Sequence, residues 1–248
     1  MASRLEGLTR SSRISVEQVL TDYDRRYQDW LARADRYRLS DLKGDDLNIL
    51  IPPRIFELAS SSDKIEVVEL ACELGKFDDV YEPALSVLIV ERGVLGPDSR
   101  QEEEDKNNPW GGTINIRREK AIEKGILTQE DKLLMSLIAH DGWSVLGGVE
   151  VRSFIIAEDL RGKGAGTAFY AMFEQVLKVM GYRYIYGHNG PDSIDFFLNS
   201  GRYAAADLNS ASEEARNLTP NGLKGDGISL TVKFLDSDLE RLCVNGRN

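Results

Sequence analysis

Residues 149–188 read VEVRSFIIAEDLRGKGAGTAFYAMFEQVLKVMGYRYIYGH, and this stretch decides the fold. Its first part becomes fully apolar at Phe154 to Ala157, which predicts a buried strand. A glycine-rich loop follows, and then apolar residues recur at helical spacing up to Gly181. The aromatic segment Tyr182 to Tyr186 is β-prone and completes a strand, helix and strand. We expect the two strands to be parallel neighbours.

The loop between the first strand and the helix has the composition of an anion-binding site. It consists of Arg161, Gly162, Lys163, Gly164, Ala165 and Gly166, followed by Thr167 in the helix. Unpaired amides and the positive end of the helix dipole converge there, and glycines leave room for close approach. Because Arg161 and Lys163 add positive charge, we expect a diphosphate as the ligand.

Three glycines at alternate positions are a weak signal, so two nucleotide-binding alternatives stay open. A dinucleotide fingerprint has its third glycine one place later and an acidic residue at the end of the next strand, which here ends at Gly187-His188. The phosphate loop of nucleotide hydrolases has a Lys-Ser/Thr pair after its last glycine, whereas Thr167 follows Gly166 directly. Both alternatives fit the loop less well than a general diphosphate site.

The same segment resembles the acetyl-coenzyme A-binding motif of the GNAT superfamily of N-acetyltransferases. That motif, Arg/Gln-x-x-Gly-x-Gly/Ala, is matched by Arg161, Gly164 and Gly166. The resemblance continues through Asn189 to residues 193–201, which are similar to the family's Asn-x-x-Ala-x-x-x-Tyr-x-x-x-Gly-Phe helix, and it covers about 55 residues.

The resemblance implies an α/β fold with a mixed, largely antiparallel sheet that is splayed between two central parallel strands and flanked by helices. It implies an acyl-CoA-binding catalytic domain over residues 81–248, closed by a strand at 228–234. Residues 1–80 match nothing in the family, and we expect a mainly helical extension. Its clearest helix starts at Ser15, which has capping-box spacing with Gln18.

Local patterns predict the remaining elements. They are a short strand at 47–51, a helix at 63–74, strands at 84–90 and 113–117, a solvated acidic loop at 96–112 and a mostly helical segment at 119–140.

Carried over by position, the amides of Arg161 to Thr167 would hold the pyrophosphate of acetyl-CoA. Phe154, Ile155 and Ile156 would pair with pantetheine like an added strand, and Asn189 would contact the same arm. The acyl group would lie in a gap between residues 153–157 and 184–188.

Transfer to an amine needs a base, because an alkylammonium with a pKa near ~10 is mostly protonated at neutral pH. Glu150 is the first candidate, since several family members carry a carboxylate on this strand, and His188 is the second. His140 lies outside the motif and is interpreted as structural. A main-chain N–H near Phe154 or Ile155 would meet the oxyanion.

The thiolate raises a separate question. The family often has a tyrosine four residues before the helix-ending glycine, where its hydroxyl protonates or hydrogen-bonds the thiolate sulfur. Phe197 occupies that position here and is expected to contact the cofactor. Because phenylalanine has no hydroxyl, Tyr203, Ser193, Tyr186 or water would have to replace it. The alternative is a catalytically silent acyl-CoA-binding or interaction module.

Composition sets limits on partners and location. The 248 residues include 31 Lys/Arg and 41 Asp/Glu, and the net charge of −10 argues against nucleic-acid binding and favours a cationic acceptor. No apolar run reaches the ~20 residues of a membrane span. Cys72 and Cys243 lack disulfide or metal spacing, so we expect no metal and a cytoplasmic location. The acceptor would be a small molecule or a protein, and a homodimer is compatible with the sequence.

Overall fold

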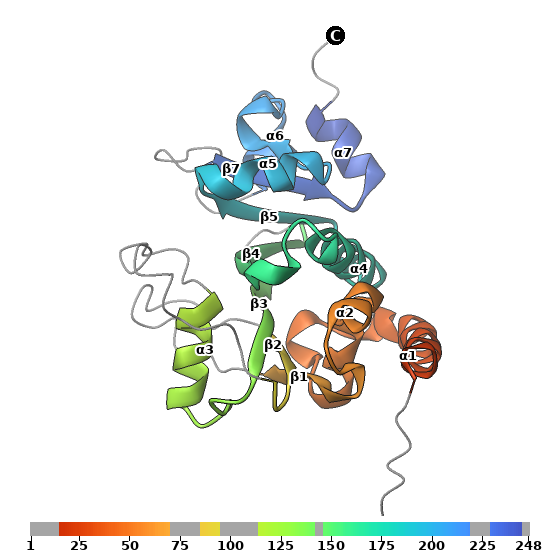
Figure 1. The fold of residues 1–248 in the computed structure, drawn as a ribbon. Coiled ribbons are helices and arrows are strands. Elements are labelled where there is room, and N and C mark those ends of the chain that lie inside the picture. The colour runs from red at the N-terminus through yellow and green to blue at the C-terminus, as the bar shows by residue number, and fades with distance from the viewer. Residues whose placement is uncertain (1–14, 70–84, 95–113, 142–145, 219–228, 245–248) are drawn as a thin grey trace, which may run out of the picture.

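Figure 1 shows the fold in a computed structural model that describes residues 15–69, 85–94, 114–141, 146–218 and 229–244. Within these residues, seven strands form one sheet in the order β1-β2-β3-β4-β5-β7-β6. The strands are β1 Ile65–Glu69, β2 Leu85–Glu91, β3 Lys132–Asp141, β4 Gly148–Ile156, β5 Tyr184–Asn189, β6 Tyr203–Ala204 and β7 Ser229–Phe234. Only β4 and β5 pair in parallel. The predicted α/β fold, with a largely antiparallel sheet that holds two central parallel strands and is flanked by helices, is therefore confirmed.

Helices cover both faces of this sheet. The α-helices are α1 Val16–Leu31, α2 Pro53–Leu58, α3 Ile114–Glu123, α4 Ala165–Val179, α5 Pro191–Asn199, α6 Glu213–Arg216 and α7 Ser237–Val244. Short 3-10 helices are η1 Ala34–Arg36, η2 Leu39–Asp41, η3 Gly44–Leu50, η4 Ser62–Lys64, η8 Glu158–Leu160 and η9 Ala205–Asp207. In Figure 1, α1, α2 and α4 lie on one side of the sheet and α3 lies on the other.

The N-terminal segment packs into the main core. The capping box predicted at the start of α1 is present, with reciprocal hydrogen bonds between Ser15 and Gln18. Trp30 is 1% exposed, and the Tyr23 hydroxyl donates to the carbonyl of Ile49 at 2.8 Å. This part is mainly helical, but β1 joins the sheet as an edge strand. The predicted domain boundary at residue 80 lies outside the described residues.

Several element predictions in the first half were wrong. The expected strand at 47–51 is part of η3, the expected strand at 113–117 belongs to α3, and residues 65–69 of the expected helix form β1. β1 carries Val67 and Val68, which pair with Ile89 and Leu88 of β2. β-branched residues fit a pleated surface, and this pairing overrides the local helix signal. The strand expected at 84–90 is confirmed as β2, and the loop at 96–112 lies outside the described residues.

The largest error concerns residues 132–140, which were expected to be helical and form β3. Eight consecutive residues, 133–140, are buried there. A strand in the middle of a covered sheet is apolar on both faces, and periodicity cannot separate such a run from a buried helix.

The β4–α4–β5 unit confirms the central prediction. α4 is followed by Gly181 with a φ of +86°, the left-handed conformation that favours glycine at a helix end. β4 and β5 pair with each other only from Gly148–Tyr184 to Glu150–Tyr186. Beyond these residues both strands continue, but no ladder joins them to each other.

The gap between β4 and β5 begins near the end of their ladder. A Cβ at Gly187 would lie 2.8 Å from the carbonyl oxygen of Val151, so the strands are still close at this point. The gap therefore opens beyond Val151 and Gly187. The expected lining by Tyr184 to Tyr186 is wrong, because these residues pair with β4.

Candidate functional site

The glycine loop presents free backbone donors at the start of α4. Gly162 and Gly164 have φ angles of +70° and +82°. In the described part of the chain, the amides of Gly162 and Gly164 to Thr167 have no hydrogen-bond partner. A Cβ built at Gly164 would meet nothing within 4 Å, and residues 161–164 are exposed. These features together form an open anion cradle.

Arg54 of α2 holds this loop from the N-terminal segment. Its Nε donates to the carbonyl oxygen of Lys163 at 3.1 Å, and its guanidinium also pairs with Glu57. In a planar trans peptide, the carbonyl of Lys163 and the N–H of Gly164 point in opposite directions. Arg54 therefore orients the Gly164 N–H away from α2. Sequence reasoning missed this contact because 109 positions separate the two residues.

The end of β4 beside the loop has a free edge. Phe154, Ile155 and Ile156 pair with β3 on one side and have no ladder partner on the β5 side among the described residues. All three are half-buried. The Arg161 Nε donates to the carbonyl of Ile156 at 3.2 Å, and a Cβ at Gly166 would lie 2.5 Å from Ile156 Cδ1. The glycine thus lets α4 approach β4 closely.

A buried carboxylate lies at the last rung of the β4–β5 ladder. The Glu150 side chain is 4% exposed. Its nearest polar neighbours are His140 Nε2 at 3.0 Å, Arg152 Nε at 2.8 Å, the Tyr186 hydroxyl at 3.2 Å and His188 Nδ1 at 3.7 Å. We call these five residues the Glu150 cluster. It contains both histidines of the chain, and the structure thus brings together Glu150 and His188, the two residues predicted as alternative bases.

Hydrogen bonds and charge fix the ionisation of this carboxylate. Burial by itself would raise the pKa of Glu150, but hydrogen bonds from His140 and His188 and the charge of Arg152 lower that pKa to about 2. Burial and the nearby carboxylate raise the pKa of Tyr186, so its phenol stays protonated and donates. A carboxylate with so low a pKa accepts protons poorly at neutral pH.

His140 and Arg152 are members of the cluster that the sequence interpretation did not include among the site residues. His140 pairs with Glu150 across β3 and β4, next to a register shift between Ile138 and Ala139. The shift leaves Arg152 as an extra residue in β4. In a regular strand Glu150 and Phe154 would share a face. Here Phe154 packs on Phe169 of α4, whereas Glu150 meets Tyr186 on the opposite face.

Two other predicted residues have side chains engaged elsewhere. Tyr203 lies on β6, which β7 separates from β5, and its hydroxyl donates to Glu240 at 2.6 Å. The structure does not bring it to the Glu150 cluster. The Asn189 amide donates to the Gly187 carbonyl at 2.9 Å and to the Thr231 hydroxyl at 2.7 Å. The contact between Asn189 and pantetheine stays a prediction, and it would have to use the side-chain oxygen of Asn189.

Phe197 packs in the core beneath α4. It is 7% exposed, its ring centroid lies 5.3 Å from that of Tyr170, and the Arg202 guanidinium lies 4.3 Å from the Phe197 centroid. Arg202 is 4% exposed and was not singled out from the sequence. Its Nη1 donates to Thr231 at 3.2 Å, while Nε and Nη2 have no partner.

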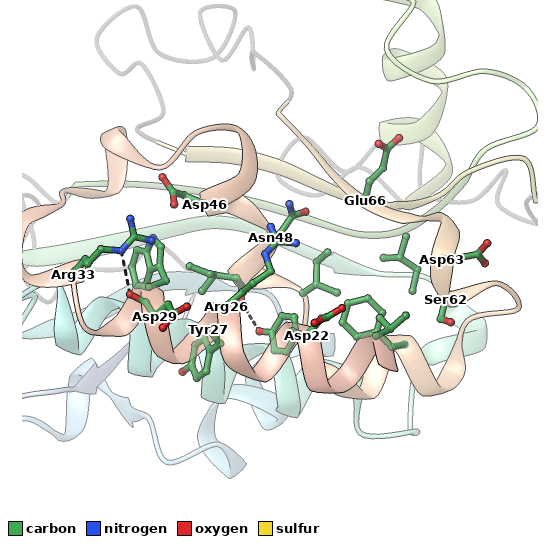
Figure 2. A pocket seen from close by; sticks show the side chains of 17 residues that line it. Asp22, Arg26, Tyr27, Asp29, Arg33, Asp46, Asn48, Ser62, Asp63 and Glu66 are labelled. Atoms are coloured by element: carbon green, nitrogen blue, oxygen red, sulfur yellow. Dashed lines mark hydrogen bonds between the residues drawn. The ribbon is translucent and has the colours of Figure 1, made fainter. Parts of the chain in front are cut away.

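A separate hollow of about 620 Å³ lies between α1, η3 and β1 (Figure 2). Acidic groups surround it together with the stacked rings of Tyr23 and Tyr27. The acidic residues are Asp22, Asp29, Asp46, Asp63 and Glu66. None of the residues predicted for the site lines this hollow.

Within the described ranges, no three His, Cys, Asp or Glu side chains are grouped as metal ligands would be. The helices of the same ranges include none with the length and apolar character of a membrane span.

No protein-family model matches the chain, and no curated protein is significantly similar to its sequence. Solved structures that are similar to it include GCN5 from Tetrahymena, at 16% identity and a TM-score of 0.35, over 44% of this chain and 65% of that chain. The similar part therefore spans less than two thirds of that protein. A GNAT superfamily phosphinothricin acetyltransferase from Sinorhizobium meliloti, in complex with AcCoA, is similar at 14% identity and a TM-score of 0.34, over 70% and 90%. The ribosomal-protein-S18-alanine N-acetyltransferase from Escherichia coli is similar at 15% identity and 0.30, over 42% and 63%.

Proposed function

We propose that the chain is an N-acyltransferase that moves an acetyl group from acetyl-CoA to a primary amine by direct transfer. One arrangement carries the proposal. An anion cradle opens next to the free edge of β4, and that edge leads to the Glu150 cluster where the ladder to β5 ends.

The three parts of this arrangement fit the three parts of acyl-CoA. The loop amides and Lys163 suit the diphosphate. The free main-chain groups of β4 suit the amides of pantetheine, in the manner of an added strand. From Ile156 to Val151 the strand covers five steps of ~3.3 Å, or roughly 16 Å, which would carry the thioester toward the start of the gap.

The residues near that point suit parts of the chemistry. His188 offers an imidazole for amine deprotonation, and the Glu150 carboxylate lies 3.7 Å from its Nδ1. Free N–H groups of β4 beyond the ladder are suitable donors to an oxyanion. Phe197 supplies no acid, but a thiol has a pKa near ~8.5, so a thiolate leaves with little help from a proton donor.

A catalytically silent acyl-CoA-binding module is the second candidate. It is favoured by Phe197 in place of a tyrosine and by the bond that holds Tyr203 on Glu240. It shares the cofactor site with the first candidate and differs only in turnover, so one series of measurements separates the two.

Calorimetric titration with acetyl-CoA, CoA and ATP tests the cofactor site, and Gly164→Glu is the decisive variant. We expect it to weaken CoA binding more than tenfold, because a side chain and a negative charge would enter the cradle. Gly181→Glu is the matched control. Gly181 also has a positive φ and open surroundings, but it lies at the other end of α4. Both substitutions carry the same backbone strain, and only the first should change affinity.

A thiol-release assay with acetyl-CoA and a panel of primary amines then tests turnover. The panel contains spermidine, a lysine peptide and an aminoglycoside, since the net charge of −10 favours cationic acceptors. CoA binding without release for any amine would favour the silent module. Tight ATP binding without CoA binding would contradict both candidates.

A further inference from the structure

The geometry of the Glu150 cluster indicates which of its residues takes the proton from the amine, if the protein catalyses the acyl transfer proposed above. We propose that His188 is the general base that takes the proton from the amine, and that Glu150 is a positioning residue that orients the His188 ring.

Polar side chains surround both oxygens of the Glu150 carboxylate. Oε1 faces Arg152 at 2.8 Å and His188 at 3.7 Å, whereas Oε2 faces His140 at 3.0 Å and Tyr186 at 3.2 Å. Each oxygen of the carboxylate therefore has two polar neighbours within 4 Å. With a side chain that is 4% exposed, the carboxylate cannot contact an amine directly.

His188 has the access that Glu150 lacks. It follows the last rung of the ladder by two residues, and its side chain is 36% exposed. Its Nδ1 is turned toward Glu150 at 3.7 Å, which leaves Nε2 on the opposite edge of the ring. A carboxylate beside Nδ1 favours the proton on that nitrogen and leaves the Nε2 lone pair free. Hydrolase triads divide the work between carboxylate and histidine in the same way.

The second histidine serves as a control within the same cluster. His140 is 3% exposed, and its Nδ1 lies 2.8 Å from the carbonyl oxygen of Asp141. A carbonyl oxygen only accepts, so His140 Nδ1 is the donor of this hydrogen bond, and His140 Nε2 accepts from Arg152 Nε at 3.2 Å. His140 contacts the same carboxylate but is too buried to reach a substrate, and it acts as an anchor for Glu150.

The surroundings suit a base that gains a positive charge. Among the described residues, Glu150 is the acidic group within ion-pair distance of His188, and on β7 the neighbour of His188 is Leu230. Arg152, His140 and Tyr186 contact the same carboxylate. The negative charge of Glu150 therefore lies beside the ring that would receive the proton.

The step balances without another reactant. The proton of the ammonium passes to His188 Nε2, and the free amine forms a C–N bond to the thioester carbonyl carbon. The C–S bond then breaks with its electron pair on sulfur. The second amine proton goes to the thiolate, which leaves an amide and the CoA thiol, and the imidazolium returns its proton to solvent.

Thiol release from acetyl-CoA with the amines named above tests the assignment in His188→Ala, His140→Ala and Glu150→Gln. We expect His188→Ala to lower kcat by ~10²–10⁴-fold with an unchanged Kd for CoA, and free imidazole to restore part of the rate. Imidazole should not restore Glu150→Gln, whose histidine is present but misoriented. With hydroxylamine, which is neutral at pH 7, His188→Ala should lose much less, because no ammonium has to be deprotonated.

Three results would overturn the assignment, and they are distinguishable. Wild-type kcat/KM in His188→Ala, or a loss that imidazole does not restore, removes His188 as the base. Loss in Glu150→Gln with full activity in His188→Ala would make Glu150 the base. Absence of turnover in the wild-type protein with intact CoA binding would remove the acyl transfer itself.

Discussion

The sheet carries two buried charged clusters, one on each face of β5, and they differ in how well their groups are paired. In the Glu150 cluster each carboxylate oxygen has two polar neighbours. On the opposite face, Arg202, Tyr170, Glu174 and Lys233 form a second group, the Arg202 cluster. There, Nε and Nη2 of Arg202, the Tyr170 hydroxyl and Oε1 of Glu174 lack partners. The Arg202 guanidinium lies near the Tyr170 hydroxyl, and its charge partly offsets the rise in the pKa of Tyr170 that burial causes.

The same residue type consequently titrates in opposite directions in the two clusters. Hydrogen bonds outweigh burial at Glu150 and lower its pKa to about 2. At Glu174, burial outweighs the charges of Lys233 and Arg202, and the pKa is raised. Lys233 Nζ lies 3.8 Å from the Glu174 carboxylate, and its hydrogen bond goes to the carbonyl of Ser200 at 2.7 Å. A buried charged group holds a fixed position without loss of stability only where its polar atoms all have hydrogen-bond or ion-pair partners. Where partners are missing, burial of the charge lowers stability.

The largest expected effect comes from removing the paired carboxylate. Glu150→Ala should lower the free energy of unfolding by ~3–5 kcal/mol, because it removes the counter-charge of Arg152 and a buried polar neighbour of His140 and Tyr186. Urea denaturation measures this loss. The exposed Glu158→Ala is the control and should stay within ~0.5 kcal/mol. A loss below ~1 kcal/mol at Glu150 would show that the cluster is not paired as described.

The second-largest expected effect is a loss of the stability contributed by Glu150 as the pH is lowered. The folded pKa of Glu150, about 2, lies below the unfolded value of 4.5, so its contribution is present above pH 4.5 and disappears as the pH falls toward 2. The stability difference between wild-type protein and Glu150→Gln should therefore shrink by a few kcal/mol across that window. The pKa of Asp131 is also about 2, but Asp131 is present in both proteins and cancels. A difference that is constant with pH would contradict the assigned pKa.

Removing the central cation of the other cluster should cost far less. Arg202→Met loses one hydrogen bond to Thr231 and the contact with the Phe197 ring, but it also removes two unpaired buried nitrogens. We expect the free energy of unfolding to change by less than ~1.5 kcal/mol. A loss as large as that of Glu150→Ala would mean that the Arg202 nitrogens have partners in solution and that the two clusters are alike.

The smallest effect has the opposite sign. Because the folded pKa of Glu174 is raised, its charged form costs stability above that pKa, and the cost disappears when the pH falls below 4.5. Glu174→Gln should therefore stabilise the protein at pH 7 by up to ~1 kcal/mol and have no effect at pH 3. Thermal unfolding at both pH values measures this. A destabilised variant at pH 7 would show that Lys233 and Arg202 compensate the buried charge.

Predictions from the sequence succeeded where contacts are local. The loop at Arg161 to Gly166, α4 with its stop at Gly181, and the strands on either side follow from helical spacing, glycine placement and short apolar runs. They failed for β1, β3, α3 and η3. The β3 run is buried on both faces and has no alternation, and β1 is a strand only because β2 pairs with it.

The sequence by itself determined an anion cradle and the strand, helix and strand that build it, because turn glycines and helix amides act within a few residues of one another. It also placed Glu150 on the first of two parallel neighbouring strands and His188 at the end of the second. Only the tertiary structure decided that His140 and Arg152 complete that cluster, because a one-residue shift between β3 and β4 changes the face on which Glu150 lies. It also decided that Arg54 supports the loop, since this contact exists only after distant segments pack together.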